Sequence, residues 1–291
     1  MQNTFSVVIP TLGRLDSLAE TLESLSACDP LPDQTIVVDG DMDRSAEGIV
    51  SGASNGIEGL RYLHSAAGLT HQRNRGLEEV TGDVTVFLDD DVSVPRDVFA
   101  RLASYLTDTS VVGLAARIVE PSSNAVGGKE SAIRALLPGG GSEGSFTRFG
   151  YPRRITHPDR SMDVEIMQGC FMVARTRHAR EVGFDETLTG YALAEDEDFS
   201  FRLSRLGRIR YVPSIVVHHH NKGFAGRDRR AFGRQVVVNR SYLFKKNFPQ
   251  TLLARIQFAA LIGVLLCHRV INLDFRGALG IVDGALEIVR S

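Results

Sequence analysis

The segment Asp83-Val84-Thr85-Val86-Phe87-Leu88-Asp89-Asp90-Asp91 joins a run of strand-forming residues to three consecutive carboxylates. Val, Thr and Phe favour strands, so 83–88 is predicted to be a buried strand that ends at the acids. Alternate side chains of an extended segment share a face, which places Asp89 and Asp91 together. With no Lys or Arg between them they repel unless a cation is present, and their oxygens suit Mg²⁺ or Mn²⁺. The alternative is a solvated acidic turn at the end of a strand.

Strand and helix patterns alternate around this segment. Strands are predicted at 5–10, 34–39, 60–64, 83–88, 111–119, 164–173 and 209–219, and helices at 15–25, 71–80, 98–106, 199–206, 227–248, 252–271 and 275–289. The alternation predicts an α/β fold, a mostly parallel sheet flanked by helices, with a helical C-terminal extension. Thr11, Asp39 and the acidic triplet each follow a strand, and such strand ends converge on ligand sites.

Composition narrows the class of protein. The chain has 291 residues, with 33 Lys and Arg against 35 Asp and Glu, which argues against a nucleic-acid-binding protein. Three scattered cysteines fit a reducing compartment, and the N-terminus lacks the basic start of a signal peptide. The longest uninterrupted apolar run, 258–267, is half the roughly 20 residues that a membrane span needs. We therefore expect a cytoplasmic protein without a membrane span.

Two further clusters are candidates for chemistry. Residues 195–198 (EDED) precede a helical pattern; a carboxylate there could act as a general base, although acids also favour the first turn of any helix. Residues 218–220 are three histidines that close a strand. One of them could be a further metal ligand, or the group could be a surface cluster.

The C-terminal region is basic and then apolar. Residues 222–246 contain one acid, Asp228, and eight basic residues: Lys222, Arg227, Arg229, Arg230, Arg234, Arg240, Lys245 and Lys246. This asymmetry indicates an anionic partner, or alternatively a solvated helix face. The apolar helices after it could contact a membrane in its plane, or pack on the catalytic domain or a second subunit.

Taken together and in order, these motifs resemble the family 2 glycosyltransferases, which have the GT-A fold. The resemblance spans about residues 5–248 and rests on 7–14 (VVIPTLGR), 37–40 (VVDG), 72–77 (QRNRGL), 87–91 (FLDDD), 183–186 (GFDE), 195–199 (EDEDF) and 211–213 (YVP). The acidic triplet takes the place of the family's DxD metal motif, and 195–199 that of its EDxDL motif. Processive members carry QxxRW and membrane helices; this chain has no Trp, which implies addition of a single sugar.

The resemblance implies a role for each site residue. Thr11 and Asp39 would hold the base and ribose, and Arg14, Arg73 and Asp90 would also contact the nucleotide sugar. Asp89 and Asp91 would anchor the metal and the ribose–diphosphate. Asp196 would deprotonate the acceptor hydroxyl. The metal-binding His would be His219, with His220 as the alternative.

The implied function is an inverting glycosyltransferase that uses Mn²⁺ or Mg²⁺ and a nucleotide-diphosphate sugar. The acceptor would be a glycan or lipid-linked hydroxyl in surface polysaccharide or glycoconjugate synthesis, and the enzyme could be a homo-oligomer or lie at the inner face of the membrane. The predicted domains are 1–221, with a nucleotide half (1–120), a variable loop (121–162) and an acceptor half (163–221), and then 222–291. The alternatives are a sugar nucleotidyltransferase and a membrane-surface binding module with a degenerate catalytic half.

Overall fold

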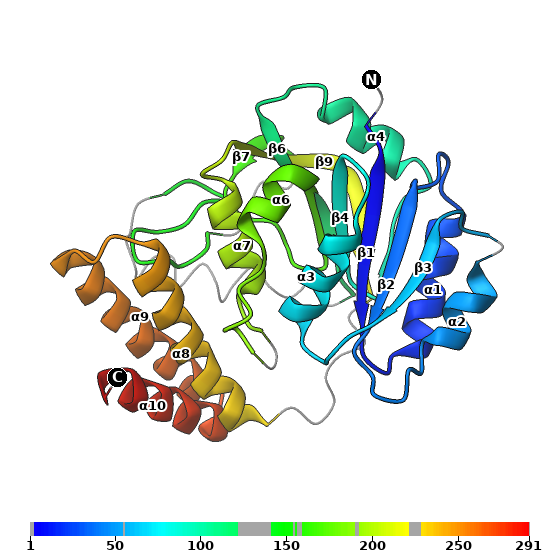
Figure 1. Ribbon diagram of the computed structural model, residues 1–291. Helices are drawn as coiled ribbons and strands as arrows, with labels where there is room; N and C mark the ends of the chain where they lie inside the picture. Colours follow the sequence, from blue (N-terminus) through cyan, green and yellow to red (C-terminus); the bar gives the residue numbers. More distant parts are fainter. Residues whose placement is uncertain are drawn as a thin grey trace. The chain divides into compact units, whose positions relative to one another are not determined.

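The computed structural model describes residues 3–54, 56–121, 141–153, 155, 159–189, 192–220 and 228–290 (Figure 1). These residues fall into two compact units. Unit 1 contains residues up to 121 together with 155–221, and unit 2 contains 122–154 together with 222–291. Of the loop predicted at 121–162, residues 141–153 therefore group with the C-terminal helices, whereas 155 and 159–162 group with unit 1.

Unit 1 is built on one sheet of nine described strands, in the order β3-β2-β1-β4-β8-β6-β9-β5, with β7 also paired to β9. The strands are β1 (Phe5–Thr11), β2 (Gln34–Asp39), β3 (Leu60–His64), β4 (Val84–Leu88), β5 (Val92–Ser93), β6 (Val111–Val119), β7 (Met162–Val164), β8 (Phe171–Arg175) and β9 (Arg208–His219).

The sheet is mixed, whereas the sequence predicted a mostly parallel one. Strands β3, β2, β1 and β4 are parallel, but β8 runs antiparallel between β4 and β6, and β5 and β7 run antiparallel to β9. Parallel pairing returns between β6 and β9. The strand predicted at 164–173 is in fact two strands, β7 and β8, because the chain leaves the sheet between Val164 and Phe171.

Helices cover both faces of the sheet. They are α1 (Leu15–Ser26), α2 (Glu47–Ala53), α3 (Leu69–Glu79), α4 (Val98–Tyr105), α6 (Thr176–Val182) and α7 (Glu195–Leu203). In β1 the side chains alternate: Val7 and Ile9 pack with α1, α2 and α4, whereas Val8 packs with α3, α6 and α7. The unit is thus a three-layer α/β structure, as expected, and α7 begins four residues earlier than predicted.

Unit 2 contains three helices, α8 (Arg229–Asn247), α9 (Leu252–Ile271) and α10 (Phe275–Arg290), close to the ranges predicted (Figure 1). Helices α8 and α10 approach closely: a Cβ at Gly280 would lie 2.0 Å from the Arg230 carbonyl oxygen. A small core of Phe149, Phe244 and Phe258 joins residues 141–153 to α8 and α9.

One expectation about this region needs correction. Helix α9 has 20 residues and a window of mean hydropathy 1.5, so by length and composition it could cross a membrane. The helix itself was predicted at 252–271, but the expectation of no membrane span considered only the uninterrupted apolar run within it. Four polar residues interrupt the rest of the helix: Arg255, Gln257, His268 and Arg269.

Candidate active site

The predicted site residues converge at one edge of the unit 1 sheet. Thr11 ends β1, the acidic triplet follows β4, and His219 ends β9. Strand β5, which follows the triplet directly, pairs antiparallel with β9 and aligns Val92 with His219. This long-range pairing brings the histidine to the acids.

Asp89, Asp91 and His219 form a cluster that could hold a metal ion. One side-chain ligand atom from each lies within 4.8 Å of the others. Asp91 Oδ1 is buried 3.2 Å from His219 Nε2, yet it has no well-directed hydrogen-bond partner among the described residues. The His220 amide donates to the Asp91 carbonyl at 2.9 Å, but its imidazole contacts Ser93 Oγ through Nε2 at 2.7 Å and is not one of the three clustered ligand groups. The structure therefore brings the imidazole of His219, and not that of His220, to the acids.

The charges of this cluster are strongly coupled. Burial would raise the pKa of Asp91, but His219 and Arg14 outweigh it and hold that pKa at about 2. Burial would lower the pKa of His219, but contacts with Asp91 and Glu120 raise it to about 9. A proton on His219 Nε2 and a divalent cation would occupy the same space beside Asp91, so cation binding would displace that proton.

Arg14 and Thr11 hold the middle acid, Asp90. Thr11 Oγ1 donates a 2.7 Å hydrogen bond to Asp90 Oδ2, and Arg14 forms ion pairs with Asp90, at 3.0 Å, and with Asp91. Burial, partly offset by these contacts, raises the pKa of Asp90 to about 6. The Arg14 side chain is one-third exposed, so its guanidinium can also meet a ligand.

Arg73 is fully buried under the other side of the cluster. Its guanidinium donates to Asp89 Oδ1, Glu195 Oε1 and the Gly169 carbonyl, each at 2.8 Å. It also lies 5.3 Å from the centre of the Phe184 ring. The sequence argument for a cation between Asp89 and Asp91 overlooked Arg14 and Arg73, which are distant in sequence and neutralise part of this charge.

Asp196 lies in the first turn of α7, next to Glu195. Its Oδ2 accepts from the Gly169 amide at 2.9 Å, while the Gly169 carbonyl is held by Arg73, so Gly169 links Asp196 to the Arg73–Asp89 pair. Burial and the negative charge of Glu197 raise the pKa of Asp196, and Arg73 opposes that rise. Burial and Asp196 likewise raise the pKa of Glu195. An acid with a raised pKa accepts a proton more readily than an ordinary one.

Asp39 is fully buried at the end of β2. Its carboxylate accepts hydrogen bonds from the Asp41 amide, the Ala46 amide and the Tyr62 hydroxyl, at 2.9 to 3.1 Å. It therefore shapes the loop after β2, and its contact with a base stays a prediction.

Three residues that contact the site were given no individual role by the sequence analysis. Gln72 donates through Nε2 to the carbonyls of Thr11 and Val38 and so ties the ends of β1 and β2 together. Glu195 is a partner of Arg73, and Glu120 Oε1 contacts His219 Nδ1 at 3.0 Å. Glu120 follows β6, so the rule that strand ends converge could have found it. Of the basic stretch, Lys222 and Arg227 lie outside the described residues, as do 122–140 of the variable loop.

Asp89, Asp91 and His219 fit a divalent cation by chemistry as well as by position. Two carboxylates and one imidazole suit Mn²⁺ or Mg²⁺, and the poorly satisfied Asp91 Oδ1 leaves a lone pair available. Glu120, on the far nitrogen of His219, is the second partner that metal-binding histidines usually have.

Comparisons of the chain with known proteins identify its family. The model of the family described as glycosyl transferase family 2 matches residues 6–182. The pre-mycofactocin glycosyltransferase of Mycobacterium tuberculosis, in strains CDC 1551 / Oshkosh and H37Rv, is 33% identical over 222 residues, 74% of this chain and 42% of the relative. The chain thus spans less than half the length of these curated relatives.

Solved structures show the same fold. S. aureus TarS has a TM-score of 0.57 at 16% identity, covering 96% of this chain and 54% of TarS. The mannosyltransferase PcManGT from Pyrobaculum calidifontis, in complex with GDP-Man and Mn²⁺, has a TM-score of 0.58 at 16% identity, covering 99% and 81%. These structures share the fold of this chain, and the family model covers more than half of its residues; the chain belongs to glycosyl transferase family 2.

Proposed function

We propose that this protein is an inverting glycosyltransferase that moves one hexosyl or deoxyhexosyl unit from a nucleotide-diphosphate sugar to an acceptor hydroxyl. The observation that carries the proposal is the convergence of Asp89, Asp91 and His219, with Asp196 linked to them through Gly169 and Arg73. The structure of PcManGT contains GDP-Man and Mn²⁺, which supports a nucleotide-sugar donor and a metal here.

The donor would lie along the strand ends, with Thr11 and Asp39 toward the base and ribose. Arg14 would position the diphosphate together with Asp90, with which it forms an ion pair. The buried Arg73 would act through Asp89, the carboxylate that it holds. Asp89, Asp91 and His219 would hold Mn²⁺ or Mg²⁺, which when bound neutralises charge on a diphosphate leaving group.

Asp196 would take the proton of the acceptor hydroxyl as that oxygen attacks the anomeric carbon. The bond from that carbon to the diphosphate oxygen breaks in the same step, and the electron pair leaves with the diphosphate. One displacement inverts the anomeric centre, and holding donor and acceptor in line removes much of the entropic barrier.

The acceptor would be a glycan or lipid-linked hydroxyl in surface polysaccharide or glycoconjugate synthesis. The nucleotide-binding half is 1–120, and 163–221 would face the acceptor. The loop 121–162 follows the donor half directly, which suits a role in acceptor choice. We place the enzyme in the cytoplasm, at the inner face of the membrane if its C-terminal helices bind lipid.

A thermal-shift panel of UDP, GDP, dTDP and CMP, each with and without Mn²⁺, tests the donor site. Binding at a hundredfold excess over Kd adds about 2.7 kcal/mol to apparent stability. The proposal expects one diphosphate to raise the melting temperature, and to do so only with metal. If none does so under either condition, the nucleotide site is wrongly placed. Release of a diphosphate from that donor, with no triphosphate required, then separates sugar transfer from nucleotidyl transfer.

A further inference from the structure

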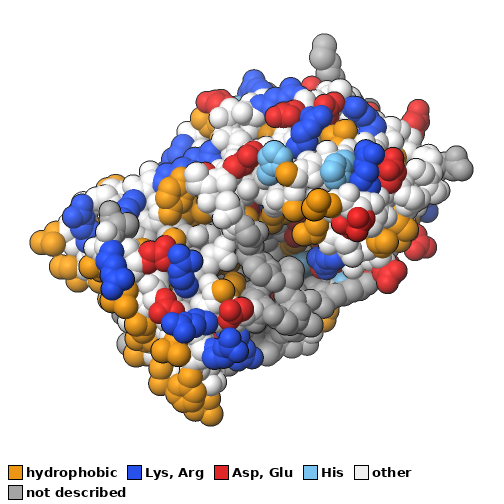
Figure 2. Space-filling view, turned by 60° about the horizontal axis from the view of Figure 1, so that its bottom comes forward, with side chains coloured by type: hydrophobic (Ala, Val, Ile, Leu, Met, Phe, Trp, Pro, Cys, Tyr) orange, Lys and Arg blue, Asp and Glu red, His pale blue; other side chains and the backbone are white. Residues whose placement is uncertain are grey.

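Unit 2 exposes an unusual share of the large apolar side chains. Seventeen such side chains are exposed among the described residues, and eleven of them lie between Leu252 and Val289. Figure 2 shows hydrophobic side chains gathered along the edge of the C-terminal helices, beside a band of alternating acidic and basic groups. Scattered exposed apolar residues are ordinary, but a contiguous concentration marks an interaction surface.

Helix α10 shows how this surface arises. Its small residues, Gly277, Gly280 and Gly284, face inward, and a Cβ at Gly284 would lie 2.8 Å from the Arg234 carbonyl oxygen of α8. Five of its larger apolar residues follow a spacing of four and three along the opposite side, whereas Ile281 is buried and Ile288 packs on the core of unit 2. The five are Phe275, Leu279, Val282, Leu286 and Val289, with exposed fractions of 39–83%. Most of the large apolar side chains of α10 therefore face solvent, while its glycines face the neighbouring helix, unlike a usual surface helix that buries its apolar stripe.

Helix α9 presents a second apolar face. Its inner face is committed to the core of unit 2: Phe258 stacks on Phe244 of α8, with ring centres 4.9 Å apart, and Ala254 and Leu261 are buried beside it. Its outer face exposes Leu253, Ile256 and Val270, among others. Because one face is packed on protein, α9 is suited to lie on a lipid surface rather than to cross the bilayer.

The positive charge of residues 228–290 favours an anionic partner. Residues 228–290 contain ten Lys and Arg against four Asp and Glu, a net charge of +6. Each of these four acids already pairs with an arginine of the same unit: Asp228 with Arg276, Asp274 with Arg269, Asp283 with Arg230 and Glu287 with Arg234. Arg255 and Arg290 form no ion pair among the described residues.

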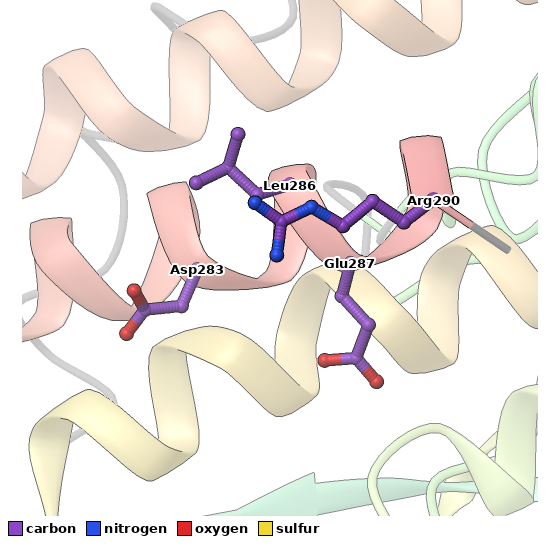
Figure 3. Close-up of a pocket in the computed structure, with 4 residues that line it drawn as sticks. All are labelled: Asp283, Leu286, Glu287 and Arg290. Carbon is purple, nitrogen blue, oxygen red and sulfur yellow. The ribbon is translucent and has the colours of Figure 1, made fainter.

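Figure 3 shows that acidic and apolar side chains leave α10 on different sides. Asp283 and Glu287 leave the helix toward α8, while Leu286 points the other way. These three residues and Arg290 line a shallow depression of about 460 Å³.

We propose that the outer faces of α9 and α10 form a docking surface for an anionic lipid bilayer, with both helices lying in the plane of the interface. Apolar side chains would enter the acyl boundary, and the flanking arginines would meet lipid headgroups. A second copy of the chain fits less well, because two surfaces of like charge would meet while the acids of 228–290 are already paired. The inference does not depend on the proposed transferase activity.

Co-sedimentation of the full-length protein with vesicles tests the surface. We expect binding to vesicles of phosphatidylcholine mixed with phosphatidylglycerol, weak binding to phosphatidylcholine alone, and loss of binding as salt rises. The double variant L279Q/L286Q should lower partitioning at least tenfold. Arg255→Gln and Arg290→Gln should each lower it about fivefold on anionic vesicles only, which corresponds to about 1 kcal/mol per charge near the surface.

Met42→Gln is the matched control, because Met42 is a 91% exposed apolar residue of unit 1 and should leave partitioning unchanged. All variants should keep the melting temperature of the parent, since only exposed positions change. The proposal is overturned if L279Q/L286Q sediments with anionic vesicles like the parent. It is also overturned if that variant abolishes a concentration-dependent dimer that binds no vesicles, or if membrane-bound protein resists alkaline carbonate extraction as a spanning helix would.

Discussion

Removal of Arg73 should strongly destabilise unit 1. The side chain is fully buried and makes three 2.8 Å hydrogen bonds, two of them to the carboxylates of Asp89 and Glu195. Breaking a buried ion pair from one side costs about 3–5 kcal/mol, because the remaining charge is uncompensated. Asp89 is partly exposed and keeps some solvation, so most of this cost should come from Glu195. We expect Arg73→Ala to lower the free energy of unfolding by about 3–5 kcal/mol.

The loss of unfolding free energy in Arg73→Ala should depend on pH. Burial already raises the pKa of Glu195, and loss of Arg73 removes the charge that opposes this rise. A native-state pKa above the unfolded value means that the native state binds more protons, so stability falls as pH rises through that window. The Arg73→Ala deficit should therefore be smaller in mildly acidic buffer than in alkaline buffer. Adding Glu195→Gln to Arg73→Ala should recover part of the lost stability, because it removes the unpaired charge.

Urea unfolding followed by circular dichroism measures both effects. Arg75→Ala, on the same helix, is the control: it removes solvent-accessible pairs with Glu78 and Glu79, and should change stability little. Equal urea midpoints for Arg73→Ala and Arg75→Ala would refute the view that Arg73 stabilises unit 1 by neutralising buried carboxylates. A deficit that grows toward acid pH would refute the role given to Glu195.

Three further outcomes follow from the same structure. Asp196→Asn should keep the donor-induced thermal shift and lose about 10²–10⁴-fold in transfer rate, and normal transfer by the variant would contradict the role of Asp196 as the base. The transfer rate of the parent should rise with pH as Asp196 loses its proton, because the pKa of Asp196 is raised above the ordinary value of about 3.9. Glu120→Gln should weaken Mn²⁺ binding about 10–100-fold by calorimetry, because Glu120 orients His219; unchanged affinity would make that contact incidental. Gly76→Ala should lower the free energy of unfolding by about 1–3 kcal/mol, since the new Cβ would lie 2.4 Å from Val8 Cγ1. Gly52→Ala should stabilise α2 slightly, because nothing lies within 4 Å of a Cβ there, and equal melting temperatures for the two variants would contradict this packing.

Local patterns were enough to predict the α/β class and most element positions. The apolar alternation of β1 and the spacing of Leu18, Leu22 and Leu25 in α1 depend only on nearby residues, so they can be read directly. The site acids were predictable for the same reason, because Asp89–Asp91 end a buried strand and strand ends converge. The helix in which EDED forms the first turn was placed too late, because its acids carry no apolar periodicity.

The ionic partners of the site could not be predicted, because each comes from a distant segment. Arg73 reaches Asp89 and Glu195 only when α3, β4 and α7 pack together, and Glu120 reaches His219 only when β6 pairs with β9. The mixed sheet has the same cause, since strand direction depends on long connections rather than on strand composition. The helical spacing of α10 indicated a helix, but it took the close approach of its glycines to α8 to decide which apolar face was left toward solvent.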